Sequence, residues 1–266
     1  MKTIRTVYFA IAVIATLLVL GCSSDDSSNE NETPPERTFE DVEKDFSELE
    51  LQEGIADYRL DVPSGLSWNF RVIAPDVSDG VKKPLFVNLH GAAGGDPNVH
   101  KATSCYVEPG LENIEAFVIS PNGGTNLWQE PINQSQVVGL VTLAIKYWDI
   151  DPNKVVVLGY SNGGNGSWFF AETQPEVFSA GIPMASSYST IGPDGQPRKI
   201  DTPLYVIHGE NDALFPLAET QAWVDKSVEA GSSIQFVVAP GLTHNEPCEY
   251  APYLQDAVEW LNSSVW

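Results

Sequence analysis

The sequence predicts an α/β fold with a mostly parallel central sheet, helices on both faces and no large lid. From residue 84 onward, short apolar runs alternate with helical patterns. Several of these runs are almost continuously apolar, as is typical of parallel strands buried on both faces. Before them, two β-rich runs at 55–62 and 66–74 flank Pro63-Ser64-Gly65, which predicts an antiparallel hairpin at the edge of the sheet.

The other elements follow from apolar spacing and from turn residues. Helix 135–148, for example, has apolar residues three and four apart, the spacing of one helical face. The insert at 186–201 is short and polar, so neither a substantial lid nor a second domain is expected. We expect strands at 84–90, 116–120, 154–159, 180–184, 203–208 and 233–239, and helices at 135–148, 163–173, 217–230 and 253–262.

The N-terminal segment has the pattern of an export signal. A short basic start and an apolar stretch up to Leu20 predict a signal peptide over residues 1–21. The apolar stretch is shorter than the about 20 residues that a comfortable transmembrane helix needs. Leu20-Gly21-Cys22 resembles the bacterial lipobox, in which the cysteine is lipidated and becomes the first mature residue. Cys22 is therefore the expected lipidation site, with an ordinary signal peptide or an uncleaved anchor as alternatives.

The residues after Cys22 predict a tether. Residues 23–36 contain almost nothing apolar and cannot bury enough surface to become ordered. We expect a flexible acidic tether over 22–45 and a single folded domain over 46–266. The acidic cluster resembles the surface-export signal of Bacteroidetes-type lipoproteins. The expected location is the outer membrane or cell surface, or the periplasm, with membrane contact only through the lipid.

Charge and cysteine content limit the partners. The formal net charge of −22 argues against nucleic acid and against anionic membrane surfaces. Cys105 and Cys248 are expected to form a disulfide in an oxidising compartment, with two buried free thiols as the alternative. No His, Cys and Asp cluster has metal-ligand spacing, so no metal or cofactor is expected. We expect a monomer.

One motif indicates covalent chemistry. Gly159-Tyr160-Ser161-Asn162-Gly163 fits G-x-S-x-G between a predicted strand and a predicted helix. Such a turn lifts the serine hydroxyl above the sheet, and glycines flank it because a Cβ would clash in so sharp a bend. The alternative is a merely structural glycine turn. We predict that Ser161 is a nucleophile.

A serine nucleophile needs a base and an acid that orients the base. Asp212 and His244 each lie in a loop just beyond a predicted strand, and the order Ser161, Asp212, His244 is that of one large hydrolase superfamily. Other candidates fit less well: His208 lies within a strand end and His100 in a polar loop. Glu210 is a conceivable acid, whereas Asp201 precedes its strand and would lie at the wrong edge of the sheet.

The nucleophile also needs two N–H donors for the oxyanion. Asn162, directly after the serine, is the first expected donor. The second should come from the loop at 90–95, where Ala92 is the preferred residue and Gly91 or Ala93 are alternatives. His90 is expected to organise this loop rather than to transfer protons.

The chain resembles an α/β hydrolase across roughly residues 55–262. Within that superfamily, Leu89-His90-Gly91-Ala92, Ser120-Pro121-Asn122-Gly123-Gly124 with Trp128, the serine motif, and the segment 208–216 resemble the feruloyl/acetyl-xylan esterase and polyhydroxybutyrate depolymerase-like group. Prolyl-oligopeptidase-type domains share much of this pattern. The resemblance implies hydrolysis of carboxylic esters, often pendant on polysaccharides, although no carbohydrate-binding module is recognisable. Trp128 is a candidate substrate contact because an indole offers a flat face, with core packing as the alternative.

The predicted function is therefore that of an exported serine esterase whose substrate is an ester, polymeric or carbohydrate-linked. A serine peptidase with the same triad is the alternative within enzymes. A non-catalytic glycan-binding lipoprotein on a hydrolase scaffold is the alternative outside them.

Overall fold

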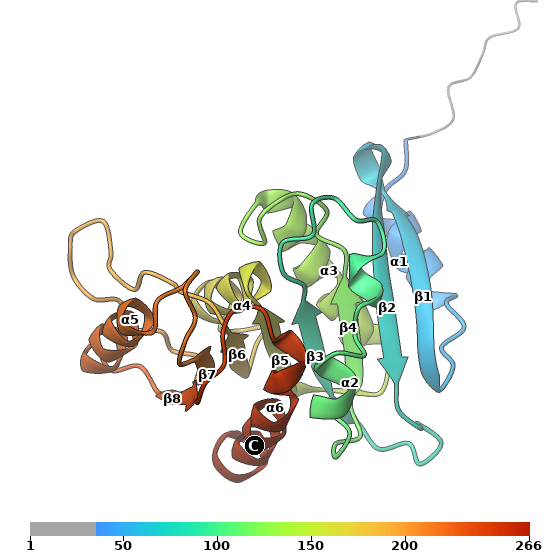
Figure 1. The fold of residues 1–266 in the computed structure, drawn as a ribbon. Helices are drawn as coiled ribbons and strands as arrows, with labels where there is room; N and C mark the ends of the chain where they lie inside the picture. The colour runs from blue at the N-terminus through green and yellow to red at the C-terminus, as the bar shows by residue number, and fades with distance from the viewer. Residues whose placement is uncertain (1–35) are drawn as a thin grey trace, which may run out of the picture. The chain divides into compact units, whose positions relative to one another are not determined.

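The computed structural model describes residues 36–266, and the predictions for the signal peptide, Cys22 and most of the tether lie outside this part. An eight-stranded sheet has the order β1-β2-β4-β3-β5-β6-β7-β8 (Figure 1). The first two strands form the expected antiparallel hairpin at one edge, β2 is also antiparallel to β4, and the other neighbours pair in parallel. The strands are β1 Gly54–Val62, β2 Leu66–Ala74, β3 Lys83–Leu89, β4 Phe117–Pro121, β5 Ile150–Tyr160, β6 Ala180–Met184, β7 Leu204–Gly209 and β8 Ile234–Ala239.

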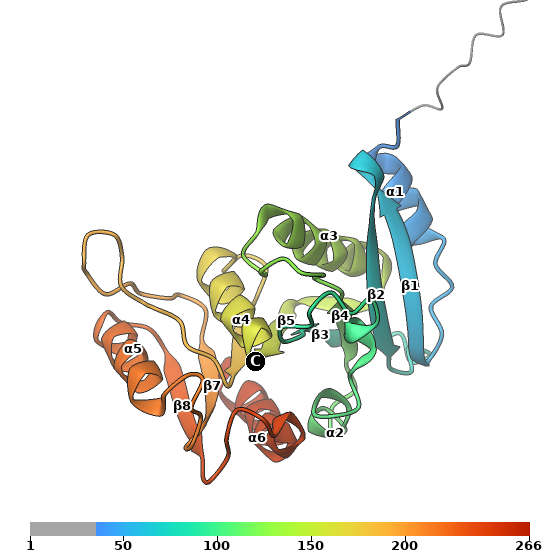
Figure 2. The same cartoon turned by 45° about the horizontal axis from the view of Figure 1, so that its top comes forward.

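Helices cover both faces of the sheet, as Figure 2 shows for α3 and α4 on one side and α2 and α6 on the other. Side chains of β5 alternate between the two cores: Val155 and Val157 belong to one, and Val156 and Leu158 to the other. This alternation explains why the strand reads as a continuous apolar run. The helices are α1 Phe39–Ser47, α2 Val107–Gly110, α3 Pro131–Tyr147, α4 Asn162–Thr173, α5 Leu217–Glu229 and α6 Ala251–Trp260.

The folded domain begins earlier than residue 46, so the predicted tether over 22–45 is too long. Thr38 and Asp41 form a capping box that starts α1. Val42 and Phe46, one helical turn apart, are each only 1% exposed. The Phe46 ring stacks on Trp148 with a 4.9 Å centroid separation. This segment is acidic in composition, yet it forms an amphipathic helix whose two buried apolar residues pack on the sheet.

Most other elements match the predicted ones to within a few residues. The start of α3 is at Pro131 instead of residue 135, since proline suits the first turn of a helix. The short helix α2 was not predicted. The 186–201 insert contains an isolated bridge between Ile191 and Pro197. Within residues 36–266, no helix is both long enough and apolar enough to cross a bilayer.

Candidate active site

The turn between β5 and α4 has a strained backbone at Ser161. Its φ of 58° and ψ of −121° are unusual for a residue with a side chain. Its N–H donates to the Met184 carbonyl at 3.0 Å. A Cβ on Gly163 would overlap the Leu89 carbonyl oxygen, and one on Gly159 would overlap the Gly163 carbonyl. The two glycines of the motif are therefore required by backbone contacts between β3, β5 and α4.

The predicted nucleophile, base and acid lie within hydrogen-bonding distance of one another. His244 Nε2 is 2.9 Å from Ser161 Oγ, and His244 Nδ1 is 2.8 Å from Asp212 Oδ2. When the Asp212 carboxylate accepts from Nδ1–H, Nε2 is left free to accept the serine proton. Ser161 follows β5, Asp212 follows β7 and His244 follows β8, so one edge of the parallel sheet supplies all three.

Asp212 is oriented by its own loop. Its side chain is fully buried, and its Oδ1 accepts the backbone N–H groups of Leu214 and Phe215, each at 2.9 Å. With the bond to His244, the carboxylate has hydrogen bonds at both oxygens. These bonds compensate for its burial and fix the face that it presents to the imidazole.

The other histidines considered from the sequence have structural contacts. His208 is fully buried in β7 and its Nε2 is 2.8 Å from the Phe215 carbonyl, so it supports the loop that orients Asp212. His100 is buried, with Nδ1 3.2 Å from Asn122 Nδ2. Burial lowers the pKa of both imidazoles, which favours their neutral forms.

The alternative acids are also engaged elsewhere. Glu210 accepts the Gly241 N–H at 2.8 Å. Asp201 pairs with Lys199 at 2.7 Å on the surface. Neither acid replaces Asp212 beside the imidazole.

The loop after β3 is organised by His90. Its Nε2 accepts the Gly123 N–H at 2.9 Å, so Nδ1, 2.7 Å from the Gly91 carbonyl, carries the proton. Burial lowers its pKa and keeps the ring neutral. His90 therefore joins two loops and is poorly suited to carrying a proton.

This loop brings a backbone N–H to the serine. Within residues 36–266, the Ala92 N–H has no hydrogen-bond partner. Asn162 is the first residue of α4, where helix geometry leaves the N–H unpaired. Ala92, Asn162 and Ser161 line the same cleft. Both residues therefore lie at the cleft where the two oxyanion donors are predicted.

The cleft has a volume of about 320 Å³ and an apolar rim. Leu127 and Leu214 are 46% and 62% exposed. They were not predicted from the sequence because nothing in a loop sequence indicates which side chain faces outward. The residues that line the cleft are His90, Gly91, Ala92, Ala93, Gly94, Gly124, Thr125, Asn126, Leu127, Ser161, Asn162, Asn165, Leu214 and Phe215.

Trp128 does not line this cleft, contrary to the substrate contact considered above. It is fully buried, and its Nε1–H donates to the His90 carbonyl at 2.9 Å. Its ring meets the His90 ring edge-on at 4.9 Å. The indole therefore packs behind the loop that carries Ala92, and only its neighbour Leu127 reaches the surface.

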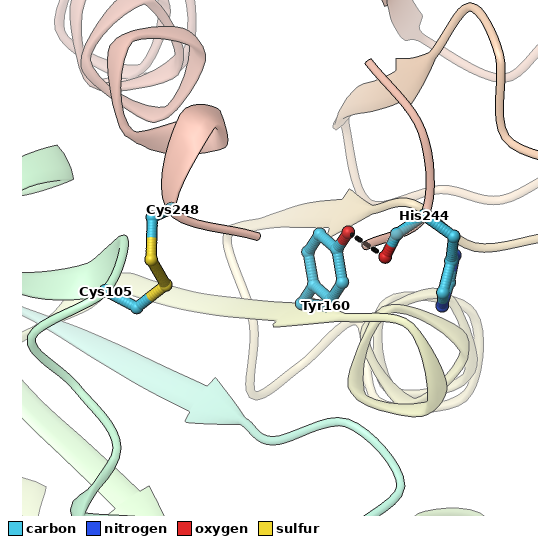
Figure 3. Close-up of a disulfide and its surroundings, with 4 residues drawn as sticks. All are labelled: Cys105, Tyr160, His244 and Cys248. Carbon is cyan, nitrogen blue, oxygen red and sulfur yellow. Dashed lines mark hydrogen bonds between the residues drawn. A yellow bond between two sulfur atoms is a disulfide. The ribbon is translucent and has the colours of Figure 1, made fainter. Parts of the chain in front are cut away.

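The loop that carries His244 has two further attachments (Figure 3). Cys248 forms a disulfide with Cys105, 143 residues away in the sequence. The Tyr160 hydroxyl donates to the His244 carbonyl at 2.8 Å. The tyrosine contact was not predicted from the sequence, because it depends on how the end of β5 lies against this loop.

Residues 36–266 contain no group of three or more His, Cys, Asp or Glu side chains that could hold a metal ion.

Comparisons with known proteins identify the family and the fold. The family model of the dienelactone hydrolase family matches residues 120–265, more than half of the chain and the part that contains all three residues of the site. A search of curated protein sequences found no match. Among solved structures, a thermostable esterase has a TM-score of 0.64 and 25% identity, and the alignment covers 78% of this chain but 62% of that one.

Two more distant structures share the fold alone. A truncated carbohydrate esterase from gut microbiota has a TM-score of 0.60 and 16% identity, covering 73% of this chain and 90% of that one. An acylaminoacyl peptidase from Pyrococcus horikoshii has a TM-score of 0.58 and 15% identity, covering 81% and 42%. On the family match and the eight-stranded sheet, the chain has the α/β-hydrolase fold and belongs to the dienelactone hydrolase family.

Proposed function

We propose that this protein is a serine esterase that hydrolyses carboxylic esters through an acyl-enzyme on Ser161. The observation that carries the proposal is the hydrogen-bonded chain from Ser161 through His244 to Asp212, which opens into the cleft. Family membership supports hydrolysis in general. The ester specificity and the roles of the individual residues are our inference.

The reaction proceeds in two halves. Ser161 Oγ attacks the ester carbonyl while His244 Nε2 takes its proton, and the Asn162 and Ala92 N–H groups stabilise the oxyanion. His244 then protonates the leaving alcohol, and the acyl group stays on Ser161. In the second half, His244 deprotonates a water that attacks the acyl carbonyl; the bond to Ser161 Oγ then breaks, His244 returns the proton to Oγ, and the carboxylic acid leaves. Asp212 stabilises the imidazolium in both halves.

A second pocket supports an alcohol part that is a carbohydrate. It has a volume of about 270 Å³ and shares Gly124 and Asn126 with the cleft of Ser161. Asn69 and Asn126 line it with partly exposed side chains, and neither amide has a hydrogen-bond partner within residues 36–266. A primary amide offers a donor and an acceptor side by side, which matches neighbouring sugar hydroxyls. Acetyl or feruloyl esters on polysaccharides are therefore the substrates that we propose.

We also propose that the enzyme is an exported lipoprotein, attached to the membrane only through Cys22 and otherwise monomeric. The signal pattern in the sequence supports this proposal. It falls within the first 35 residues, which lie outside the described part of the chain. The Cys105–Cys248 disulfide adds support, because such bonds persist in oxidising compartments. The strongly negative charge argues against a nucleic-acid partner.

The test is ester turnover by a soluble form that begins at Glu36, beside Ser161→Ala. Loss of a triad serine should cost on the order of 10⁶ in kcat. Ser187→Ala is the matched control, since the Ser187 hydroxyl is buried without a hydrogen-bond partner and should be dispensable. The substrates are p-nitrophenyl acetate, methyl ferulate, an acetylated xylo-oligosaccharide and a peptide p-nitroanilide.

The outcomes separate the alternatives. Ester turnover that disappears in Ser161→Ala supports the esterase. Faster turnover of the anilide than of every ester would favour a peptidase. Equal turnover by parent and Ser161→Ala would mean that Ser161 is not the nucleophile, and no turnover by the parent would favour a binding protein.

A further inference from the structure

The residue before the nucleophile contacts the base. The Tyr160 hydroxyl donates to the backbone carbonyl of His244 at 2.8 Å, and Figure 3 shows this bond. Because Tyr160 and Ser161 are consecutive, one strand end carries both the hydroxyl that reacts and the hydroxyl that contacts the backbone of the base.

Tyr160 is itself held rigidly. Its backbone pairs with Met184 of β6, and the residue is only 7% exposed. Its ring meets Tyr250 edge-on at 5.1 Å and lies 6.0 Å from the ring of Tyr106. Burial raises its pKa, so the hydroxyl keeps its proton over the neutral and mildly alkaline range. The donor is therefore a fixed point from which the loop can be held.

The rest of the loop is held on either side of His244. Before it, Asn211 donates to the Leu242 carbonyl at 2.8 Å. After it, Cys248 is bonded to Cys105. Within residues 36–266, the backbone of His244 has one hydrogen bond, which its carbonyl accepts from the Tyr160 hydroxyl. A shift of this carbonyl would move the imidazole with it.

We propose that Tyr160 is a positioning residue, whose hydroxyl holds the backbone of His244 so that Nε2 stays within hydrogen-bonding distance of Ser161 Oγ. This inference rests on the proposed esterase mechanism. Catalysis is sensitive to displacements of about 1 Å at the reacting groups. Removing the hydroxyl should lower kcat by about tenfold and leave KM within about twofold, because the cleft lining is unchanged.

The test is Tyr160→Phe, which removes one oxygen and keeps the ring. Tyr205→Phe is the matched control: Tyr205 is 4% exposed on β7, and its hydroxyl has no hydrogen-bond partner in the described part of the chain. Two rates are measured well below each variant's Tm, namely turnover of p-nitrophenyl acetate and labelling of Ser161 by a fluorophosphonate. Labelling reports activation of the serine without the later hydrolysis of an acyl-enzyme.

The expected result is that Tyr160→Phe slows both rates by similar factors while Tyr205→Phe does not. The inference is overturned if Tyr160→Phe matches the parent in both rates, if only KM changes, or if the deficit disappears on cooling further below Tm. If Tyr160→Phe does not fold while Tyr205→Phe does, the hydroxyl is purely structural and the inference is overturned. Inactivity of Ser161→Ala beside a normal Tyr160→Phe would overturn this inference alone, whereas an active Ser161→Ala would overturn the proposed mechanism.

Discussion

Removing the disulfide should cost stability far more than activity. Cys105 and Cys248 are 143 residues apart in the sequence, so the bridge closes a long loop in the unfolded chain. The chain-entropy relation gives about 5 kcal/mol for a loop of this length, and loss of native disulfides commonly costs about 2–5 kcal/mol. We expect the free energy of unfolding of Cys105→Ser/Cys248→Ser to fall within this range.

The effect on catalysis should be small, because a disulfide stabilises a protein mainly by restricting its unfolded state. In the folded state, His244 keeps its bonds to Asp212 and to the Tyr160 hydroxyl. We therefore expect kcat within about threefold of the parent below Tm, which corresponds to less than about 1 kcal/mol of transition-state stabilisation.

The assay is urea unfolding followed by circular dichroism, using the form that begins at Glu36 and therefore lacks Cys22. Parent protein treated with a reductant should unfold at the same urea concentration as the double serine variant, and the variant should not respond to the reductant. A loss of less than about 1 kcal/mol would refute the entropic reasoning. A large fall in kcat without a fall in stability would show instead that the bridge positions His244.

Three further predictions concern the backbone, a buried histidine and the second pocket. Gly163→Ala should lower the free energy of unfolding by more than about 3 kcal/mol, because its Cβ meets the Leu89 carbonyl. Gly192→Ala is the control and should cost less, because its Cβ meets mainly the movable Asp194 side chain. Urea unfolding measures both variants. Because burial lowers the pKa of His208, the unfolded chain takes up that proton first, so stability should fall as pH drops below about 6.5, and His208→Gln should reduce this slope. Asn69→Leu should lower the ratio of kcat/KM for acetylated xylo-oligosaccharide to that for p-nitrophenyl acetate by about tenfold, and an unchanged ratio would contradict the carbohydrate assignment.

The parallel part of the fold was predictable because its signals are local. The strand from Ala180 to Met184 has the predicted bounds, and the hairpin differs by one residue. Each apolar run contains enough buried surface to become a strand wherever it lies in the sheet. The residues that follow β5, β7 and β8 were then confined to one edge by the parallel arrangement.

The features that were missed depend on partners distant in sequence. The acidic composition of α1 suggested a tether, and only packing of Phe46 on Phe70 and Trp148 makes that segment part of the domain. A tryptophan in a loop is a candidate platform for a substrate, yet the indole of Trp128 packs behind the His90 loop. A loop sequence does not encode which of two neighbouring apolar side chains turns inward.

The end of β5 explains why one short motif was so informative. Carbonyl oxygens of β3 and α4 leave no room for a Cβ on either side of Ser161, so both positions must be glycine. The motif in the sequence therefore reflects a tertiary contact. The partners of Ser161 have no such motif, because β6 and β7 lie between β5 and β8, and His244 reaches the serine from the loop after β8. A loop of this kind needs a contact that fixes its backbone, and the Tyr160 hydroxyl at the end of β5 provides one by donating to the His244 carbonyl. The identity of the residue before the serine thus depends on the loop that it must hold, which the motif leaves unspecified.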